Sequence, residues 1–160
     1  MNAFGYKAPD DLELKILGDS ADGHLVQINL AYGHFFDFKA GAKHFFPMRQ
    51  YKLNDEIIKP AEERRYEYLF DFPYIKTDST TYQLPAVFKK EAFPVAKEIK
   101  NEFVQYKNDV LLTEATNELK IITHLRLNKH IIPSKQFNEV ANSFEAIKKD
   151  ENQKIVLKKE

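Results

Sequence analysis

Five histidines are the first residues to consider for chemistry, because imidazole can bind a metal ion or transfer a proton near neutral pH. They are His24, His34 and His44, which recur every ten residues, and His124 and His130. Neighbouring strands could bring such residues together around zinc. None has a compact ligand spacing, however, and no carboxylate lies beside two of them. Isolated histidines at the surface or at strand ends are far commoner, so we predict no metal site.

Other reactive groups are absent or lack the setting that they need. The chain contains no cysteine, which excludes thiolate nucleophiles, disulfides and metal sites built on sulfur. None of the four serines has the strained strand-to-helix turn or the neighbouring base of a nucleophile; they are Ser20, Ser79, Ser134 and Ser143. The five glycines do not cluster before a helix, as a phosphate-binding loop requires. We therefore expect no enzyme activity and no bound cofactor.

Carboxylates are numerous but poorly placed for catalysis. The densest charge cluster is Glu62-Glu63 followed by Arg64-Arg65. A solvated loop with local ion pairs, each contributing ~0–1 kcal/mol, explains this cluster better than a catalytic pair. Asp19 with Asp22 could bind calcium, but the distal Glu of an EF-hand loop is missing.

The overall composition is that of one globular domain. The 160 residues are enough for one core, and 43% of them are hydrophobic. The 24 basic residues balance the 24 acidic ones, so no excess positive charge attracts nucleic acid. No apolar run approaches the ~18 residues of a membrane span, and the first residues do not resemble a signal peptide.

Alternating patterns predict a chain made mostly of strands. Residues 1–11 read as a linker-like entry segment, and residues 12–160 as a single domain. Apolar alternation at 12–16 and 25–32, with Asp22-Gly23 between them, predicts a hairpin. The alternation of Tyr66, Tyr68, Phe70 and Phe72 predicts a strand over 64–74 with one aromatic face.

The second half adds further strands, one helix and a terminal strand. Strands are predicted over 98–106, 110–114 and 119–127, with turns at Asn108-Asp109 and Thr116-Asn117. An apolar stripe predicts an amphipathic helix over about 134–149 with Ser134 as its N-cap; the stripe is Phe137, Val140, Ala141, Phe144 and Ile147. Residues 155–157 form the last strand. The fold class is therefore mainly β, an antiparallel β-sandwich, immunoglobulin-like in broad architecture, with one covering helix. A barrel is the alternative.

Tyr66 and Tyr68 are the only candidate ligand residues. If their strand faces solvent, the rings could form a platform on which a sugar or a peptide stacks. If the strand lies in the core, they need no special role, and the core interpretation is the favoured one.

Several segments resemble one known module. They are Arg65-Tyr66 through Phe72-Pro73-Tyr74, Tyr82-Gln83-Leu84-Pro85, Ala92-Phe93-Pro94, and the ending from Asn117 to Lys159. Together these segments, over roughly 64–160, resemble the C-terminal β-sandwich domain of unknown function found after transglutaminase-like domains in envelope proteins of Gram-negative bacteria.

The resemblance implies a non-catalytic accessory domain in a periplasmic or extracytoplasmic protein. Its partner would be a transglutaminase-like domain upstream in the same polypeptide, which would carry Cys-His-Asp chemistry that no residue here matches. We expect neither nucleic-acid binding nor membrane insertion. The alternative function is a glycan- or peptide-binding module that uses exposed aromatic residues.

Overall fold

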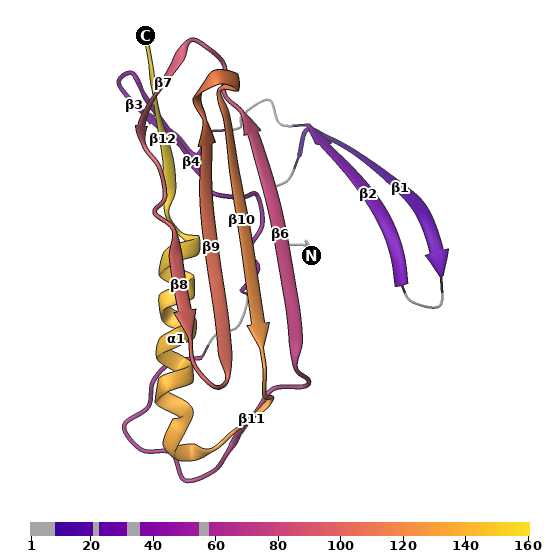
Figure 1. Ribbon diagram of the computed structural model, residues 1–160, viewed down its shortest axis with the longest axis vertical. Coiled ribbons are helices and arrows are strands. Elements are labelled where there is room, and N and C mark those ends of the chain that lie inside the picture. The colour runs from indigo at the N-terminus through magenta and orange to yellow at the C-terminus, as the bar shows by residue number, and fades with distance from the viewer. Residues whose placement is uncertain (1–8, 21–22, 32–35, 55–57) are drawn as a thin grey trace.

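The computed structural model describes residues 9–20, 23–31, 36–54 and 58–160, and shows a mainly β protein with one α-helix. Two four-stranded antiparallel sheets and the helix make up its body (Figure 1). The predicted fold class, with a C-terminal helix and a terminal strand, is confirmed.

The larger sheet supplies one complete wall of the core. Its strands run in the order β6 (Tyr74–Gln83), β10 (Glu118–Leu127), β9 (Val104–Thr113) and β8 (Lys97–Lys100). Alternate residues of β10 are fully buried: Leu119, Ile121, Thr123, Leu125 and Leu127. Because side chains alternate between the faces of a strand, one face of this sheet is the core face.

The smaller sheet packs on one half of that core face. Its order is β3 (Phe38–Ala40), β4 (Lys43–Pro47), β12 (Lys154–Lys159) and β7 (Phe88–Ala92). Its inner residues join Leu119 and Ile121 of β10 in one apolar cluster; they include Phe46, Ile155 and Leu157. The two facing sheets form the sandwich.

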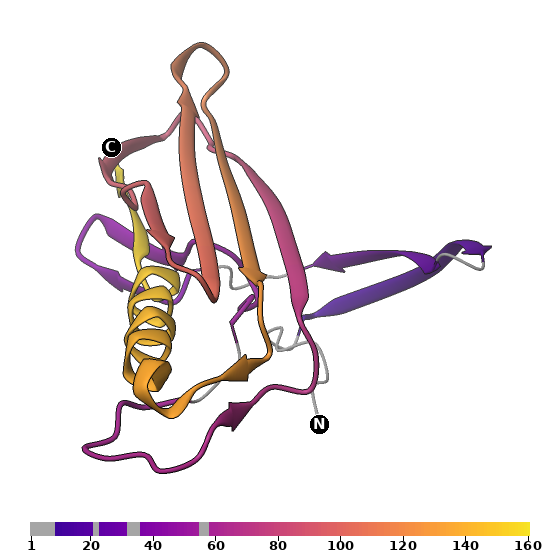
Figure 2. The same ribbon diagram turned by 60° about the horizontal axis from the view of Figure 1, so that its bottom comes forward.

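Helix α1 (Phe137–Glu151) covers the other half of the same face. The whole predicted stripe of this helix is buried, and it packs with Leu125 and Leu127 of β10. Figures 1 and 2 show α1 running along the sheet, with β12 following it directly. Full burial of a Phe or Ile side chain contributes roughly 1.5–3 kcal/mol, so this stripe holds the helix in place.

The start of the helix differs from the prediction. Residues Ser134–Gln136 form a 3-10 turn, and α1 begins at Phe137 without a side-chain cap. Ser134 is therefore not the N-cap of α1. A short strand, β11 (Ile131–Ile132), precedes this turn, and burial of Ile132 and Phe137 on either side of Pro133 fixes the chain there.

The first hairpin forms a sheet of its own. Among the described residues, strands β1 (Asp11–Ser20) and β2 (Gly23–Ala31) pair only with each other, and they project away from the body (Figures 1 and 2). The predicted turn lies partly outside the described residues, which resume at Gly23, and the entry segment 1–8 lies wholly outside them.

The predicted strand over 64–74 is wrong. Between residues 64 and 73 only β5 (Tyr68–Leu69) is a strand, and it pairs with β11. Phe70 is buried, whereas Tyr66 and Phe72 are exposed, so the aromatic alternation does not mark one face of a strand. The long strand of this region is β6, which begins at Tyr74.

The predicted turn at Asn108-Asp109 is also wrong. Both residues lie inside β9, and the connection between β8 and β9 falls at residues 101–103 instead. Asn101 forms that turn, because its side-chain oxygen accepts hydrogen bonds from the backbone N–H groups of Phe103 (2.9 Å) and Val104 (2.7 Å). A 3-10 turn at Glu114–Thr116 and Asn117, with a φ of 51°, connects β9 to β10 as predicted.

Candidate functional site

A buried ionic network lies where the two halves of the core meet. Arg49, which follows β4, is only 4% exposed. Its Nη1 atom donates a hydrogen bond to Oε1 of Glu151, the last residue of α1, at 3.0 Å. Its Nη2 atom donates to the hydroxyl of Thr123 on β10. Its Nε atom lies 3.6 Å from Oδ2 of Asp78 on β6. One side chain thus links both sheets and the helix.

Asp150 forms the second part of the network. Its Oδ2 atom accepts hydrogen bonds from the hydroxyl of Tyr106 (2.7 Å) and from Nδ2 of Asn108 (3.1 Å). Its Oδ1 atom accepts one from Nε2 of Gln153 at 2.5 Å. The hydroxyl of Thr123 donates to Oδ1 of Asn108 at 3.0 Å and so joins the two parts.

Burial is the main cause of the raised pKa values of Glu151 and Tyr106 in this network. It raises the pKa of Glu151 above the ordinary value, against the opposing effects of Arg49 and of the backbone N–H groups of Leu53 and Asn54. Burial also raises the pKa of the Tyr106 phenol, and the hydrogen bond to Asp150 adds to this effect. A buried charge is stable only when it is paired and hydrogen-bonded, which this arrangement provides.

The network is suited to holding the fold together. Arg49, Asp78, Asp150 and Glu151 are each no more than 8% exposed. A general acid or base has to come within hydrogen-bond reach of its substrate. In this conformation the carboxylates instead bond to other parts of the same chain.

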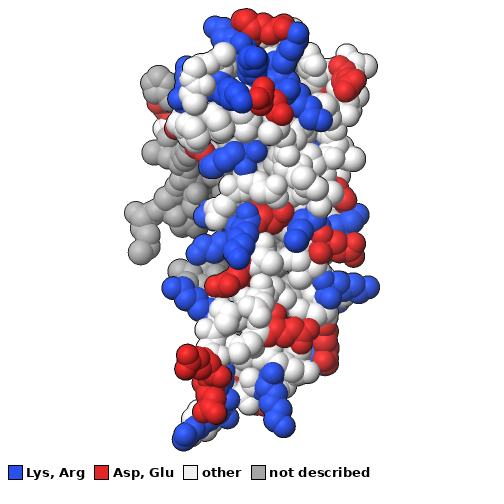
Figure 3. All heavy atoms as spheres, turned by 90° about the vertical axis from the view of Figure 1, so that its left-hand side faces the viewer, with Lys and Arg blue, Asp and Glu red and all other residues white. Residues whose placement is uncertain are grey.

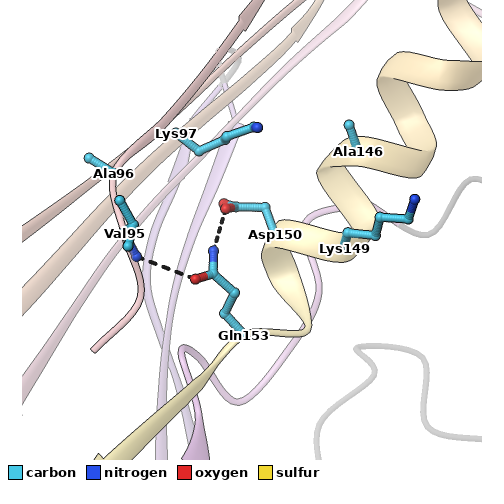
Figure 4. Close-up of a pocket in the computed structure, with 7 residues that line it drawn as sticks. All are labelled: Val95, Ala96, Lys97, Ala146, Lys149, Asp150 and Gln153. Atoms are coloured by element: carbon cyan, nitrogen blue, oxygen red, sulfur yellow. Dashed lines mark hydrogen bonds between the residues drawn. The ribbon is translucent and has the colours of Figure 1, made fainter. Parts of the chain in front are cut away.

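One cleft borders the network at Asp150 (Figure 4). It has a volume of about 490 Å³ and lies between the end of α1 and the segment before β8; it is lined by Val95, Ala96, Lys97, Ala146, Lys149, Asp150 and Gln153. Gln153 spans it, accepting a hydrogen bond from the N–H of Val95 (3.3 Å) while donating to Asp150. The carboxylate of Asp150 at the edge of this cleft is therefore already hydrogen-bonded to other side chains of the protein.

The two candidate platform residues lie in different environments. Tyr66 is 81% exposed. The ring of Tyr68 is half-buried, 5.0 Å from the ring of Phe70 and 5.4 Å from that of Phe137. The guanidinium of Arg64 lies over Tyr68, 5.1 Å from its centroid. Tyr68 therefore packs against the helix cluster, while Tyr66 faces solvent.

The described histidine side chains lie in different environments. His44 is buried between the rings of Phe36 (4.7 Å) and Phe88 (4.9 Å), so it is not a surface histidine. His124 is exposed on β10. The side chains of His24 and His34 lie outside the described part of the chain. Within that part, no three His, Cys, Asp or Glu residues are placed to hold a metal ion.

The sequence reasoning missed Arg49 and its partners. A usable signal existed, because Asn108 and Thr123 occupy core-facing positions of their strands, in phase with Tyr106 and Ile121. Buried polar residues need hydrogen-bond partners, so such positions predict a polar layer inside the sandwich.

Comparison with known proteins identifies the family. A model of a domain of unknown function with a solved structure, DUF3858, matches residues 42–157, and the chain belongs to this family. The match begins earlier than the resembling region at 64–160, because β4 and Arg49 are part of the same sandwich. It leaves out the hairpin β1–β2.

One solved structure shares the fold. It is a putative protease from Parabacteroides distasonis, with a TM-score of 0.52 and 11% sequence identity. The match covers 62% of this chain and 19% of that one, so it spans about a fifth of the solved chain. No curated protein matches. No helix in the described part of the chain is long and apolar enough to cross a membrane.

The exposed charges are mixed in sign. On the face that Figure 3 shows, lysine and arginine side chains are interspersed with aspartate and glutamate. Surface pairs of opposite charge include Lys43 with Glu91.

Proposed function

We propose that this chain is a non-catalytic accessory domain of a larger cell-envelope protein, in which it packs on or positions an upstream transglutaminase-like domain. One observation carries the proposal: the ionisable groups that the fold brings together bond to other groups of the chain inside the core, Arg49 to Glu151 and Asp78, and Asp150 to Tyr106 and Asn108. Groups used in this way stabilise a scaffold.

The family and the fold support the same proposal. The family is defined as a domain of unknown function, and the similar solved chain is several times longer than the part that matches. A module of this size within a longer chain acts beside other domains. The proposed location is the periplasm or another extracytoplasmic compartment, in line with the resemblance described above.

The test begins with the undivided protein, meaning the full-length gene product of which this chain would be one domain. We expect it to carry a signal peptide and, ahead of this domain, a domain with Cys, His and Asp in catalytic register. The purified chain 1–160 should show no peptidase or acyl-transfer activity on casein or on glutamine- and lysine-containing peptides. The undivided protein should show that activity and lose it when its catalytic cysteine is replaced by alanine. Turnover by residues 1–160 alone would contradict the proposal.

A second candidate, a glycan- or peptide-binding module, is favoured by the 81% exposure of Tyr66. Tyrosine fluorescence of residues 1–160 during titration with oligosaccharides tests it. A saturable change that Tyr66→Ala abolishes and Tyr68→Phe preserves would favour binding. A flat titration would remove this candidate.

A further inference from the structure

The hairpin β1–β2 is an amphipathic ribbon. Cross-strand partners in an antiparallel pair lie on the same face. Leu12, Leu14 and Ile16 of β1 pair with positions 30, 28 and 26 of β2, which the sequence also fills with Leu, Ile and Val. The other face carries Glu13 opposite Asn29 and Lys15 opposite Gln27. Over residues 12–16 of β1 and 26–30 of β2, one face is thus apolar and the other is polar.

The polar face is internally bonded. Nδ2 of Asn29 donates to Glu13 at 2.9 Å, and Nε2 of Gln27 donates to Oδ1 of Asn29 at 3.1 Å. Lys15 pairs with Glu13 at 3.0 Å. Polar side chains whose hydrogen bonds are formed in this way are stable in water. This face can therefore remain in solvent when the opposite face is covered.

The apolar face is left uncovered. Leu12 is 58% exposed, Leu14 53% and Ile16 71%. The hairpin belongs to neither four-stranded sheet, and it projects from the body in both views (Figures 1 and 2). A lone two-stranded hairpin is marginally stable in water, and a contiguous exposed apolar face marks an interaction site.

We propose that the apolar face of β1–β2 is the docking surface for the domain that precedes it in the same polypeptide. This inference rests on the proposed function, because it requires an upstream domain. The hairpin lies on the N-terminal side of the family module, which begins at residue 42, and it belongs to neither four-stranded sheet. Most of the similar solved chain likewise lies outside the matched part.

The size of the surface favours an occupant in the same chain over a second copy. The apolar part of the ribbon spans five residues of each strand, which gives a face of ~17 by ~10 Å, or ~170 Å² per partner. Stable association between separate molecules buries about 1,200 Å² or more in total. A tethered domain needs less, because the linker holds it at an effective concentration on the order of millimolar.

Hydrogen exchange read by mass spectrometry tests this contact, with the undivided protein compared against residues 1–160. We expect the amides of 11–31 to exchange at least about tenfold more slowly in the undivided protein. Leu14→Asp in the undivided protein should remove that protection. Gln27→Asp, which adds the same charge to the polar face, should keep it. Unchanged exchange in β9 and β10 would show that both variants are folded.

The outcomes separate the inference from the proposed function. A gene product without a preceding domain would contradict the proposed function. If a preceding domain is present but the hairpin amides of the undivided protein exchange as fast as those of residues 1–160, only the docking surface is overturned. Protection that appears in residues 1–160 alone and grows with protein concentration would assign the surface to a second copy, which also overturns the proposal.

Discussion

Arg49 and Glu151 lie 102 residues apart in the sequence and form a hydrogen-bonded ion pair of 3.0 Å inside the sandwich. Along β10, the core-facing residues are apolar on both sides of Thr123, and the ion pair lies at this break between the two apolar clusters. The pair therefore connects the sheet-on-sheet half of the core to the helix-on-sheet half.

Replacing Arg49 tests this connection. Arg49→Met should lower the free energy of unfolding by ~3–5 kcal/mol, because Glu151 and Asp78 would stay buried without their cation. Lys43→Met is the control: its partner Glu91 is on the surface, and the change should stay within ~1 kcal/mol. Urea unfolding of both variants measures the difference. Equal effects would mean that the buried pair has no special role.

Phe144 tests the attachment of the helix. Its side chain is 1% exposed and lies 5.6 Å from the ring of Phe70. Phe144→Ala should cost ~3–5 kcal/mol of stability through lost burial and the cavity that remains. Lys148→Ala, on the exposed side of α1, should change stability by no more than ~0.5 kcal/mol. A loss that small for Phe144→Ala would show that the helix is peripheral.

Asn101 tests the turn that the sequence did not predict. Besides accepting two backbone hydrogen bonds, it donates from Nδ2 to the hydroxyl of Ser143 on α1 at 2.9 Å. Asn101→Ala should cost ~1–3 kcal/mol, because two part-buried N–H groups lose their acceptor. Asn101→Asp keeps the acceptors and should cost less in thermal unfolding. If the two variants are equally destabilised, the bond to Ser143 is the important one.

Glu151 predicts an unusual pH dependence. Its pKa in the folded protein lies above its ordinary value of 4.5, so the folded state keeps a proton that the unfolded state releases. Its contribution to stability is complete below pH 4.5 and is lost as the pH rises through the folded pKa. The stability of the wild type minus that of Glu151→Gln should therefore fall as the pH is raised. A difference that grows with pH would mean that Arg49 outweighs burial.

Tyr82 and Tyr106 predict delayed ionisation. Burial raises the pKa of each phenol well above 10. In a spectrophotometric titration, Tyr82 and Tyr106 should ionise only as the protein unfolds. Because the unfolded phenols release their protons first, stability should decline above pH 10. Circular dichroism recorded in parallel would show whether the two events coincide. Ionisation of all tyrosines before unfolding would contradict the prediction.

Periodic segments were the predictable part of the fold. The stripe from Phe137 to Ile147 and the alternation of 119–127 each carry a local pattern, and both predictions are confirmed. At 64–74 alternation was misleading, because a strand also needs a partner and only Tyr68–Leu69 has one. Asn108 was predicted to be a turn residue. It lies inside β9 instead, and its buried side chain donates a hydrogen bond to Asp150.

Asn108 and Thr123 mark a polar layer on their strands, but the place of Arg49 in it could not be predicted from local pattern. Arg49 stands between Met48 and Gln50, in a stretch that resembles a surface loop. Its burial depends on β6, β10 and the end of α1, whose contributing residues are spread from Asp78 to Glu151. The tertiary fold brings these residues together. In the sequence, the only sign of it is that polar residues occupy core-facing positions of the strands.

The position of β12 between β4 and β7 imposes an order on folding. On the ribosome, residues 43–47 and 88–92 emerge long before residues 154–159, so until synthesis reaches that segment β7 has no neighbour in its sheet and β4 can pair only with β3. Strands β9 and β10, joined by a short turn, can pair as soon as they emerge. The larger sheet is therefore a template that forms early, and the smaller sheet is assembled on it after translation of β12.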